Sequence, residues 1–402
     1  MSRSWPYLLL VLAACRPSST TGTTEGAPSS SASAAPSPSA SSPPPKPARE
    51  FASGGVITLE VQKYLPLEYM AHGTWAAFSP KGEHAIVGAP GRGSLFPGDK
   101  AIGGSEPSNA SFTNDGKRFF VVRQGATSSS NEVTIHATSD LRVITKLANA
   151  FDPRWIDDDV VFDRDGQVFR LTGNETKLIG PPKPAFRERP RAVVVAPNLE
   201  SMIVVDQLDR RVSGVRRVAL TASGHDALLV SSEVLAKFSK SAEPIAVVAP
   251  DASRVCIVGP IRSETAIWCA SDDTPAEQIV SFVDSSKLYA ASFVGPNILS
   301  YRLPTAGAVG ISDFNARTAS TLSIPGGTTT TDLTPLPGGR LAVARDFYRL
   351  GIVDLAARKF TPLGDDSATP KAVAGVGTDD TVFAVTGSSL EAGLGIFRIV
   401  VK

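Results

Sequence analysis

The sequence predicts an all-β fold, a β-propeller of four-stranded blades whose ring is closed by an N-terminal strand. Three observations predict it: a turn motif that recurs between residues 75 and 390, apolar strands on both sides of each copy, and a composition rich enough in apolar residues for a large core. The chain has 402 residues, of which 42% are hydrophobic and 20% charged. A repeat of about 40 to 45 residues is typical of propeller blades.

Each repeat unit consists of an apolar strand, a tight turn rich in Pro, Asn, Asp or Gly, and a second apolar strand. The clearest copies are residues 77–87, 111–122, 194–205 and 247–258, and looser copies are 155–162, 293–299, 336–343 and 376–383. The equivalent turn positions, 34 to 53 residues apart, are Pro80, Asn114, Asp157, Pro197, Pro250, Gly295, Pro337 and Thr378. The residues between turns supply two further strands per unit, which predicts four-stranded blades. The count is eight blades, with seven as the alternative because the first unit is short and rich in Gly and Pro over 88–104.

The turn of the first unit, Phe78-Ser79-Pro80-Lys81-Gly82, resembles the repeats of TolB-like and WD-repeat propellers. The resemblance covers most of residues 75–390 with degenerate motifs, and it implies a propeller fold. It implies no ligand, because no Trp-Asp dipeptide ends any strand. A β-sandwich or a β-helix is the alternative, but either would have shorter periods or no shared turn.

Ring closure is predicted from the two ends of the propeller domain, residues 51–402. The last unit has strands at 381–385 and 395–401 and is one strand short of four. Residues 56–61, of sequence Val-Ile-Thr-Leu-Glu-Val, precede the first unit and form the expected fourth strand. Pairing the two termini in one blade would remove the open edges that invite aggregation.

Residues 1–14 have the layout of a secretory signal, with Arg3 as the positive charge and an apolar stretch over 7–12. The apolar segment of about ten residues is too short to span a bilayer, which takes about 20. The run Leu12-Ala13-Ala14-Cys15 resembles the lipobox of bacterial lipoprotein precursors. The resemblance implies cleavage before Cys15 and a lipid on its sulfur, which would anchor the chain to a membrane. An ordinary signal peptide that ends near a cysteine is the alternative.

The composition of residues 15–50 predicts a disordered tether. From residue 16 to residue 50 there is no Val, Ile, Leu, Met, Phe, Tyr or Trp, while Ser and Pro are abundant. Such a segment cannot form a core. We expect a spacer between the anchor and the folded domain. The alternatives are a glycosylated stalk or a segment that a partner domain binds. Arg16 stands where the inner-membrane retention signal of lipoproteins is typically Asp, which favours an outer membrane, the cell surface or the periplasm.

The net charge of the chain bears on its expected partners. The chain has 40 Lys plus Arg and 39 Asp plus Glu, and removal of residues 1–14 takes away only Arg3, so the mature chain is formally neutral. A dedicated nucleic-acid binder usually has a clear basic excess, so nucleic acid is not an expected partner. The expected partners are the membrane, through the lipid on Cys15, and another envelope protein or an extracellular ligand.

Two cysteines remain after lipidation, Cys256 and Cys269. Export would place them in an oxidising compartment, where a pair is interpreted as a disulfide. They lie on the consecutive strands 254–258 and 266–270, so a hairpin would place them opposite each other. A redox-active pair or a metal site is the alternative, but the spacing is not that of C-x-x-C and no His is close in sequence.

No catalytic residue, metal ligand or cofactor is predicted. The four histidines are scattered over different units, and neither H-E-x-x-H nor G-x-S-x-G occurs. The run Ser223-Gly224-His225-Asp226 contains the residue types of a catalytic triad but is interpreted as a turn. The runs 157–159 and 163–166 are rich in Asp and are likewise interpreted as turns rather than calcium loops.

A candidate binding face appears when charges are mapped onto the predicted strand order. One face carries the loops between second and third strands and between blades, and arginines, acidic residues and aromatics gather there. The candidates are Arg123, Arg187, Arg189, Arg191, Arg210, Arg211, Arg262, Arg345, Asp346, Tyr348 and Arg349. Arginine with aromatics is suited to recognising carboxylates, phosphates or protein side chains. The alternative is that these are ordinary polar loops.

The expected function is therefore a binding or scaffold module at the cell envelope, with its ligand undetermined by the sequence. The alternative is a propeller enzyme, such as a lactonase or a glycoside-acting enzyme, with carboxylates or a metal in the central channel.

Overall fold

The structure is a computed structural model. It describes residues 57–64, 75–89, 92–104, 107–124, 130–186, 190–209, 211–239, 243–283, 290–305, 307–324, 331–335, 341–346, 350–355, 357–362, 368–376, 382–388 and 394–401. The predicted signal sequence, Cys15 and the predicted tether lie outside the described residues.

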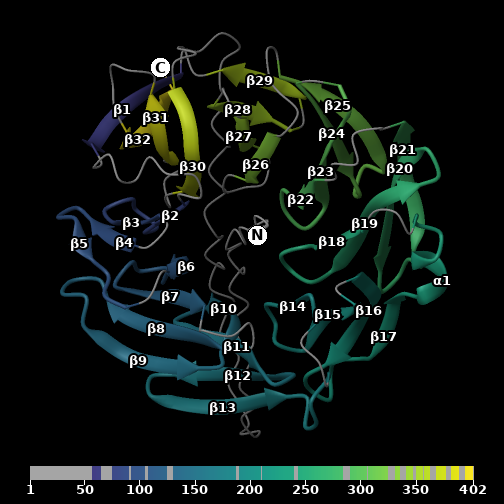
Figure 1. The fold of residues 1–402 in the computed structure, drawn as a ribbon, viewed down its shortest axis with the longest axis horizontal. Coiled ribbons are helices and arrows are strands. Elements are labelled where there is room, and N and C mark those ends of the chain that lie inside the picture. The colour runs from purple at the N-terminus through teal and green to yellow at the C-terminus, as the bar shows by residue number, and fades with distance from the viewer. Residues whose placement is uncertain are drawn as a thin grey trace, which may run out of the picture.

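The described residues form eight four-stranded antiparallel sheets, arranged around a common centre (Figure 1). The first three blades are β2 (Trp75–Phe78), β3 (Ala85–Ala89), β4 (Arg92–Phe96), β5 (Lys100–Ala101); β6 (Pro107–Phe112), β7 (Arg118–Gln124), β8 (Asn131–Ala137), β9 (Val143–Ala148); and β10 (Phe151–Ile156), β11 (Asp159–Arg164), β12 (Gln167–Thr172), β13 (Glu175–Gly180). The next two are β14 (Ala192–Val195), β15 (Ser201–Leu208), β16 (Arg211–Ala219), β17 (Ala227–Val230); and β18 (Ile245–Val248), β19 (Arg254–Ile261), β20 (Glu264–Ser271), β21 (Glu277–Val283), with helix α1 (Ser232–Leu235) between them. The two that follow are β22 (Ala291–Phe293), β23 (Ile298–Arg302), β24 (Ala308–Asp313), β25 (Thr318–Ser323); and β26 (Thr331–Pro335), β27 (Leu341–Asp346), β28 (Leu350–Asp354), β29 (Lys359–Pro362).

The last sheet joins the two ends of the domain and confirms the predicted closure. It has the order β1-β32-β31-β30, with strands β1 (Ile57–Tyr64), β30 (Ala368–Val376), β31 (Val382–Ser388) and β32 (Leu394–Val401). Strand β1 pairs antiparallel with β32, from Ile57 opposite Val401 to Tyr64 opposite Gly395. The N-terminal strand is thus the outermost strand of the closing sheet, as Figure 1 shows.

The eight sheets correspond to the eight turns counted in the sequence. The alternative of seven blades arose from the first unit, which forms the sheet β2–β5. The fourth strand of this sheet, β5, has only two residues. A short last strand explains why this unit was difficult to recognise from its sequence.

The recurring turn has the same backbone geometry in its four clearest copies. In each, one amide donates to the carbonyl three residues earlier, at 2.8 to 2.9 Å, from Gly82, Gly116, Leu199 and Ala252. These four residues have positive φ angles of 69°, 71°, 62° and 58°. Glycine adopts such φ angles without a steric penalty, so this is the position of the turn where glycine is most favourable. Leu199 and Ala252 occupy the same position with a steric penalty between Cβ and the backbone.

Apolar side chains from neighbouring blades pack against each other. Val194, Ile203 and Val205 form one buried cluster with Val255 and Ile257 of the next blade. The opposite face of β14 and β15 packs against β11 and β12 through a second cluster. Because both faces of a sheet are covered, the second strand of a blade is a nearly continuous apolar run rather than an alternating one.

The predicted disulfide between Cys256 and Cys269 is present. The two residues are direct partners in the register of β19 and β20, with their Cα atoms 4.1 Å apart. Both are buried. The hairpin alone therefore brings them together, as the spacing in the sequence indicated.

Candidate functional site

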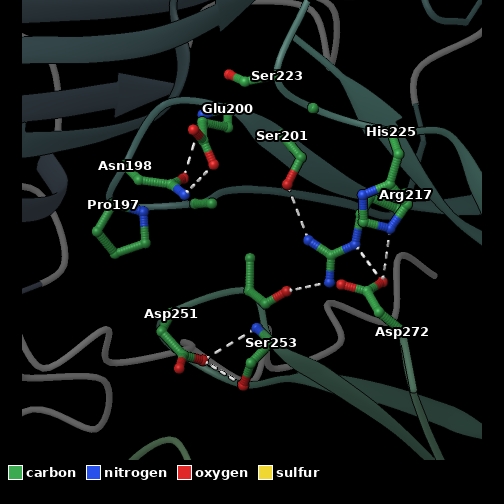
Figure 2. A pocket seen from close by; sticks show the side chains of 13 residues that line it. Pro197, Asn198, Glu200, Ser201, Arg217, Ser223, His225, Asp251, Ser253 and Asp272 are labelled. Atoms are coloured by element: carbon green, nitrogen blue, oxygen red, sulfur yellow. Dashed lines mark hydrogen bonds and ion pairs between the residues drawn. The ribbon is translucent and has the colours of Figure 1, made fainter. Parts of the chain in front are cut away.

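A polar pocket lies at the interface between blade β14–β17 and blade β18–β21 (Figure 2). Its volume is about 360 Å³. It is lined by the turns 196–201 and 251–253, the loop 223–225, Arg217 and Asp272. These segments connect first to second strands and third to fourth strands, so the pocket opens on the face opposite to the predicted arginine face.

The two turns that line the pocket are adjacent copies of the repeat. Amides of Ala196 and Ala249 donate to carbonyls of Ser201 and Arg254, both at 2.8 Å, which closes each turn against its own second strand. Two equivalent turns from neighbouring blades thus lie side by side. The repeat places them on one face, and their polar residues line the space between.

Arg217 of β16 forms the floor of the pocket and joins the two blades. Its side chain is 4% exposed, yet each of its three nitrogens donates a hydrogen bond. Nε donates to Oδ1 of Asp272 at 2.6 Å, Nη1 to Oγ of Ser201 at 2.8 Å and Nη2 to the carbonyl of Ala252 at 2.7 Å. Burial of a guanidinium is tolerated here because its hydrogen-bonding capacity is used.

His225 lies on the wall of the pocket beside the same carboxylate. Its Nε2 is 3.4 Å from Oδ1 of Asp272, across the interface between the blades. The imidazole is 59% exposed and the carboxylate 33% exposed. Oδ1 of Asp272 therefore faces two nitrogen groups, a buried one that is permanently charged and an exposed one that is charged only when protonated.

The two turns contribute further carboxylates, each held by a neighbouring residue of its own turn. Oδ1 of Asp251 accepts hydrogen bonds from the amide and the hydroxyl of Ser253, at 3.0 and 2.7 Å. Oε2 of Glu200 accepts from the Asn198 side-chain amide at 2.7 Å. These short-range bonds fix the orientation of both carboxylates before any ligand arrives.

The loop 223–226 is a turn, as predicted, and it does not assemble a triad. The amide of Gly224 donates to the Thr221 carbonyl at 3.1 Å, and the Ser223 hydroxyl pairs with that of Thr221 at 2.8 Å. Asp226 accepts from the amide of Ala219 at 2.8 Å. The carboxylate beside His225 is instead Asp272, 47 residues further along the chain.

Within the described ranges, no group of three or more His, Cys, Asp or Glu side chains is arranged to hold a metal ion. The Asp-rich runs are hairpin turns, as expected. Asp157 and Asp165 have positive φ angles of 55° and 51° at the tips of the β10–β11 and β11–β12 hairpins.

Arg123 does not belong to an accessible binding face, and this corrects the prediction. It lies within strand β7 and is 3% exposed. Its guanidinium donates to Oγ1 of Thr134 and to the carbonyl of Gly103. Burial lowers the pKa of Arg123, and the nearby carboxylate of Glu132 partly offsets this effect. Its position under the 103–104 loop indicates a structural role.

Arg191, Arg211 and Arg262 keep the placement expected of them. Arg211 and Arg262 are exposed at or beside the β15–β16 and β19–β20 connections. Arg191 forms an ion pair with Glu243 at the entrance to the next blade. Of Arg345 and Asp346 the structure describes the backbone, at the end of β27. The other candidates, Arg187, Arg189, Arg210, Tyr348 and Arg349, lie outside the described residues.

In the described part of the chain the single helix α1 has four residues, and no helix has the length and apolar character needed to span a bilayer.

Comparison with known proteins shows the fold alone. The chain is similar to the solved structure of the Dos1 propeller, with a TM-score of 0.53 and 11% identity over 85% of this chain and 95% of that one. It is also similar to a eukaryotic initiation factor, with a TM-score of 0.50 and 13% identity over 80% and 83% of the two chains. No family model and no curated protein matches the sequence. These similarities support the β-propeller and carry no function to this chain.

Proposed function

We propose that this chain is an exported β-propeller lipoprotein, anchored to a bacterial membrane through Cys15, that acts as a binding module at the cell envelope. The anchor rests on the lipobox-like sequence before Cys15, and the tether on residues 15–50. An envelope protein or an extracellular ligand is the expected partner.

The observation that carries a binding function is the pocket between blades β14–β17 and β18–β21. It is polar and open, and its carboxylates are oriented by the protein itself. Its His225–Asp272 pair is poorly suited to general-base catalysis, because Arg217 already compensates the charge of Asp272 at 2.6 Å. None of the serines lining the pocket hydrogen-bonds to His225. The geometry favours holding a ligand over transforming it.

The disulfide supports export. Cys256 and Cys269 are bridged in the core of one blade. Structural disulfides persist in oxidising compartments and are rare in the bacterial cytosol. An outer membrane, the cell surface or the periplasm is the proposed location.

A second binding surface is proposed on the opposite face, formed by the exposed arginines at the connections between second and third strands. Arg211 and Arg262 are its described members with exposed side chains. Charge reversal at Arg345 and Arg349 is expected to weaken capture of a partner through this face. Unchanged capture by the charge-reversed protein would exclude the arginine face.

The experiment that tests the anchor and the location is metabolic labelling with a palmitate analogue, followed by membrane fractionation. The wild-type chain should incorporate label and sediment with membranes, whereas Cys15→Ser should do neither. Crosslinking in intact cells followed by mass spectrometry should then identify a partner. A labelled, membrane-bound chain that crosslinks to nothing, and whose purified domain turns over lactones or glycosides, would replace the binding module with an enzyme.

A further inference from the structure

A chain of buried polar side chains crosses blade β6–β9 from one face of the ring to the other. Its members Arg123, Thr134 and His136 are 3%, 2% and 4% exposed. Nη1 of Arg123 donates to Oγ1 of Thr134, and this oxygen lies 2.9 Å from Nε2 of His136. Nδ1 of His136 lies 3.0 Å from the carbonyl of Leu141, and Nη2 of Arg123 donates to the carbonyl of Gly103. The chain thus joins the β8–β9 turn to the connection between the first two blades.

The direction of each hydrogen bond in this chain is determined. The carbonyl of Leu141 can only accept, so Nδ1 of His136 carries a proton. The guanidinium of Arg123 can only donate, so it occupies one lone pair of the Thr134 hydroxyl. In the neutral imidazole Nε2 is an acceptor, and the Thr134 hydroxyl donates to it. Every group in the chain is satisfied only while His136 is neutral.

Uptake of a proton from solvent at Nε2 of His136 reverses one of these bonds. The Thr134 oxygen would then face N–H groups from His136 and from Arg123 at once. Its own proton would lose its acceptor, because Thr134 has no other side-chain partner in the described part of the chain. Two cations would also be separated by a single buried hydroxyl. Both effects are unfavourable in a buried site, where the loss of one hydrogen bond is not compensated by water.

The surroundings of His136 favour the neutral imidazole. Its ring is stacked on that of Phe119, with the ring centres 5.0 Å apart, and Phe119 packs with Ile86 and Leu95 of blade β2–β5. Burial has the largest effect on the pKa of His136 and lowers it, the bond to the Leu141 carbonyl partly offsets this, and Arg123 and Lys146 lower the pKa further. The charged residues on the surrounding strands and turns are Arg92, Asp99, Lys100, Lys117, Arg118, Arg123, Glu132, Asp140, Arg142 and Lys146.

At the other end of the chain, Arg123 supports the loop Gly103–Gly104. A Cβ atom on Gly104 would lie 2.8 Å from Nε of Arg123, so the loop rests directly on the guanidinium. Both glycines are exposed, and the preceding strand β5 has only two residues. Residues 92–93, 101–104 and Pro107 line a cavity of about 310 Å³. A guanidinium repelled from inside the blade would regain hydration by moving outward past this loop.

We propose that His136 and Arg123 form a pH-sensitive latch on the loop Gly103–Gly104. The neutral imidazole keeps Arg123 bonded to Thr134 and to the Gly103 carbonyl, and the latch is closed. Protonation of Nε2 breaks the chain at Thr134, displaces Arg123 and opens the cavity beside the loop. A single proton is the charge change, and the loop is the element that it biases.

Hydrogen exchange of the Ile102 amide tests the latch, because this amide donates to the Gly93 carbonyl at 2.9 Å beside the loop. Exchange is compared at about pH 7.5 and about pH 5.5, on either side of the ordinary imidazole pKa, and corrected for the intrinsic pH dependence. We expect protection of Ile102 to fall by about tenfold at the lower pH, a coupling of ordinary size. The Ala249 amide, in another blade, should keep its protection.

Variants assign the effect to His136. In His136→Gln the protection of Ile102 should be the same at both pH values, since an amide does not titrate there. The matched control is His225→Gln, because His225 is 59% exposed at another interface, and this variant should behave like the wild type.

Nitrogen-15 spectra of the labelled imidazoles of the wild type test the latch without any substitution. His136 should carry its proton on Nδ1 at the higher pH and gain one on Nε2 with the same midpoint as the loss of protection at Ile102. A proton on Nε2 at the higher pH, or titration of His136 with Ile102 unchanged, would overturn the proposal. Retention of the pH effect in His136→Gln, or simultaneous loss of protection at Ile102 and Ala249, would overturn it equally.

Discussion

Replacing Arg217 with alanine tests whether the interface between blades β14–β17 and β18–β21 depends on one buried side chain. The substitution removes three hydrogen bonds, one of them to a carboxylate, and the burial of the aliphatic stem. It leaves the Ser201 hydroxyl and the Ala252 carbonyl without this partner inside a buried interface, and Asp272 without its compensating charge.

The expected loss can be worked from these contacts. Breaking a buried ion pair by removing one partner costs about 3 to 5 kcal/mol. Asp272 is 33% exposed and can recover some hydration, so the lower end of that range applies. We expect Arg217→Ala to reduce the free energy of unfolding by about 3 kcal/mol. Removing both charges in Arg217→Ala with Asp272→Ala should cost less than the sum of the two single substitutions.

Urea-induced unfolding, followed by tryptophan fluorescence, measures this loss. The matched control is Arg142→Ala, because Arg142 makes an exposed contact of 3.9 Å with Asp140. That substitution should change stability by less than about 0.5 kcal/mol. If Arg217→Ala were no more destabilising than Arg142→Ala, the side chain would not hold the blades together, and the description of the pocket floor would be wrong.

Three further predictions concern the ring as a whole. Replacing Cys256 and Cys269 together with alanine should lower the free energy of unfolding by about 3 kcal/mol, and equal urea midpoints for the variant and the disulfide-bonded wild type would contradict this. Deleting residues 57–64 should destabilise the domain because β32 loses its outer partner, whereas deleting 20–45 should leave the thermal midpoint unchanged; equal midpoints for both deletions would exclude closure by β1. Burial lowers the pKa of His136 below the ordinary value near 6.5, so the unfolded chain binds the extra proton more readily and stability should fall as the pH drops through that region. His136→Gln should flatten this pH dependence in unfolding experiments, and an unchanged profile would assign it to other groups.

The sequence was informative where local chemistry determines structure. The turn at Gly82 and Gly116 needs a positive φ angle, so its residue types were visible, and their recurrence predicted the blades. The disulfide followed in the same way, because Cys256 and Cys269 are separated by 13 positions across a tight hairpin. Both features depend on residues that are close in the chain.

Arg123 shows where the sequence was insufficient. It was assigned to a loop, but strand β7 continues to Gln124, and Arg123 therefore points into the space between blades. A difference of one or two residues in the end of a strand decides which face a side chain occupies, because side chains alternate. The sequence pattern of Phe119–Val122 shows a strand but not where it ends.

The pocket was missed for a different reason. Ser223, His225 and Asp226 drew attention as neighbours in sequence, whereas the partner of His225 is Asp272 in the next blade. The repeat held the necessary signal, since equivalent turns of adjacent units share one face. Comparing polar residues at equivalent positions of consecutive units would have brought His225 and Asp272 together.

The same comparison explains why a pocket opens at this interface. Arg118 and Arg254, each at the start of a second strand, also reach into the following blade, where they lie over the rings of Trp155 and Phe314 at 5.6 and 4.1 Å from the ring centres. At those interfaces an aromatic ring packs against the arginine, and Arg118 also donates to the Asp158 carbonyl at 2.9 Å.

Arg217 crosses its interface in the same direction but meets a hydroxyl, a carbonyl and a carboxylate instead of a ring. These polar groups bury the guanidinium, and a polar cavity rather than an aromatic ring lies above it. The ring therefore keeps one interface joined through hydrogen bonds and open to ligands, at the position where two copies of its repeat carry Asp251 and Glu200.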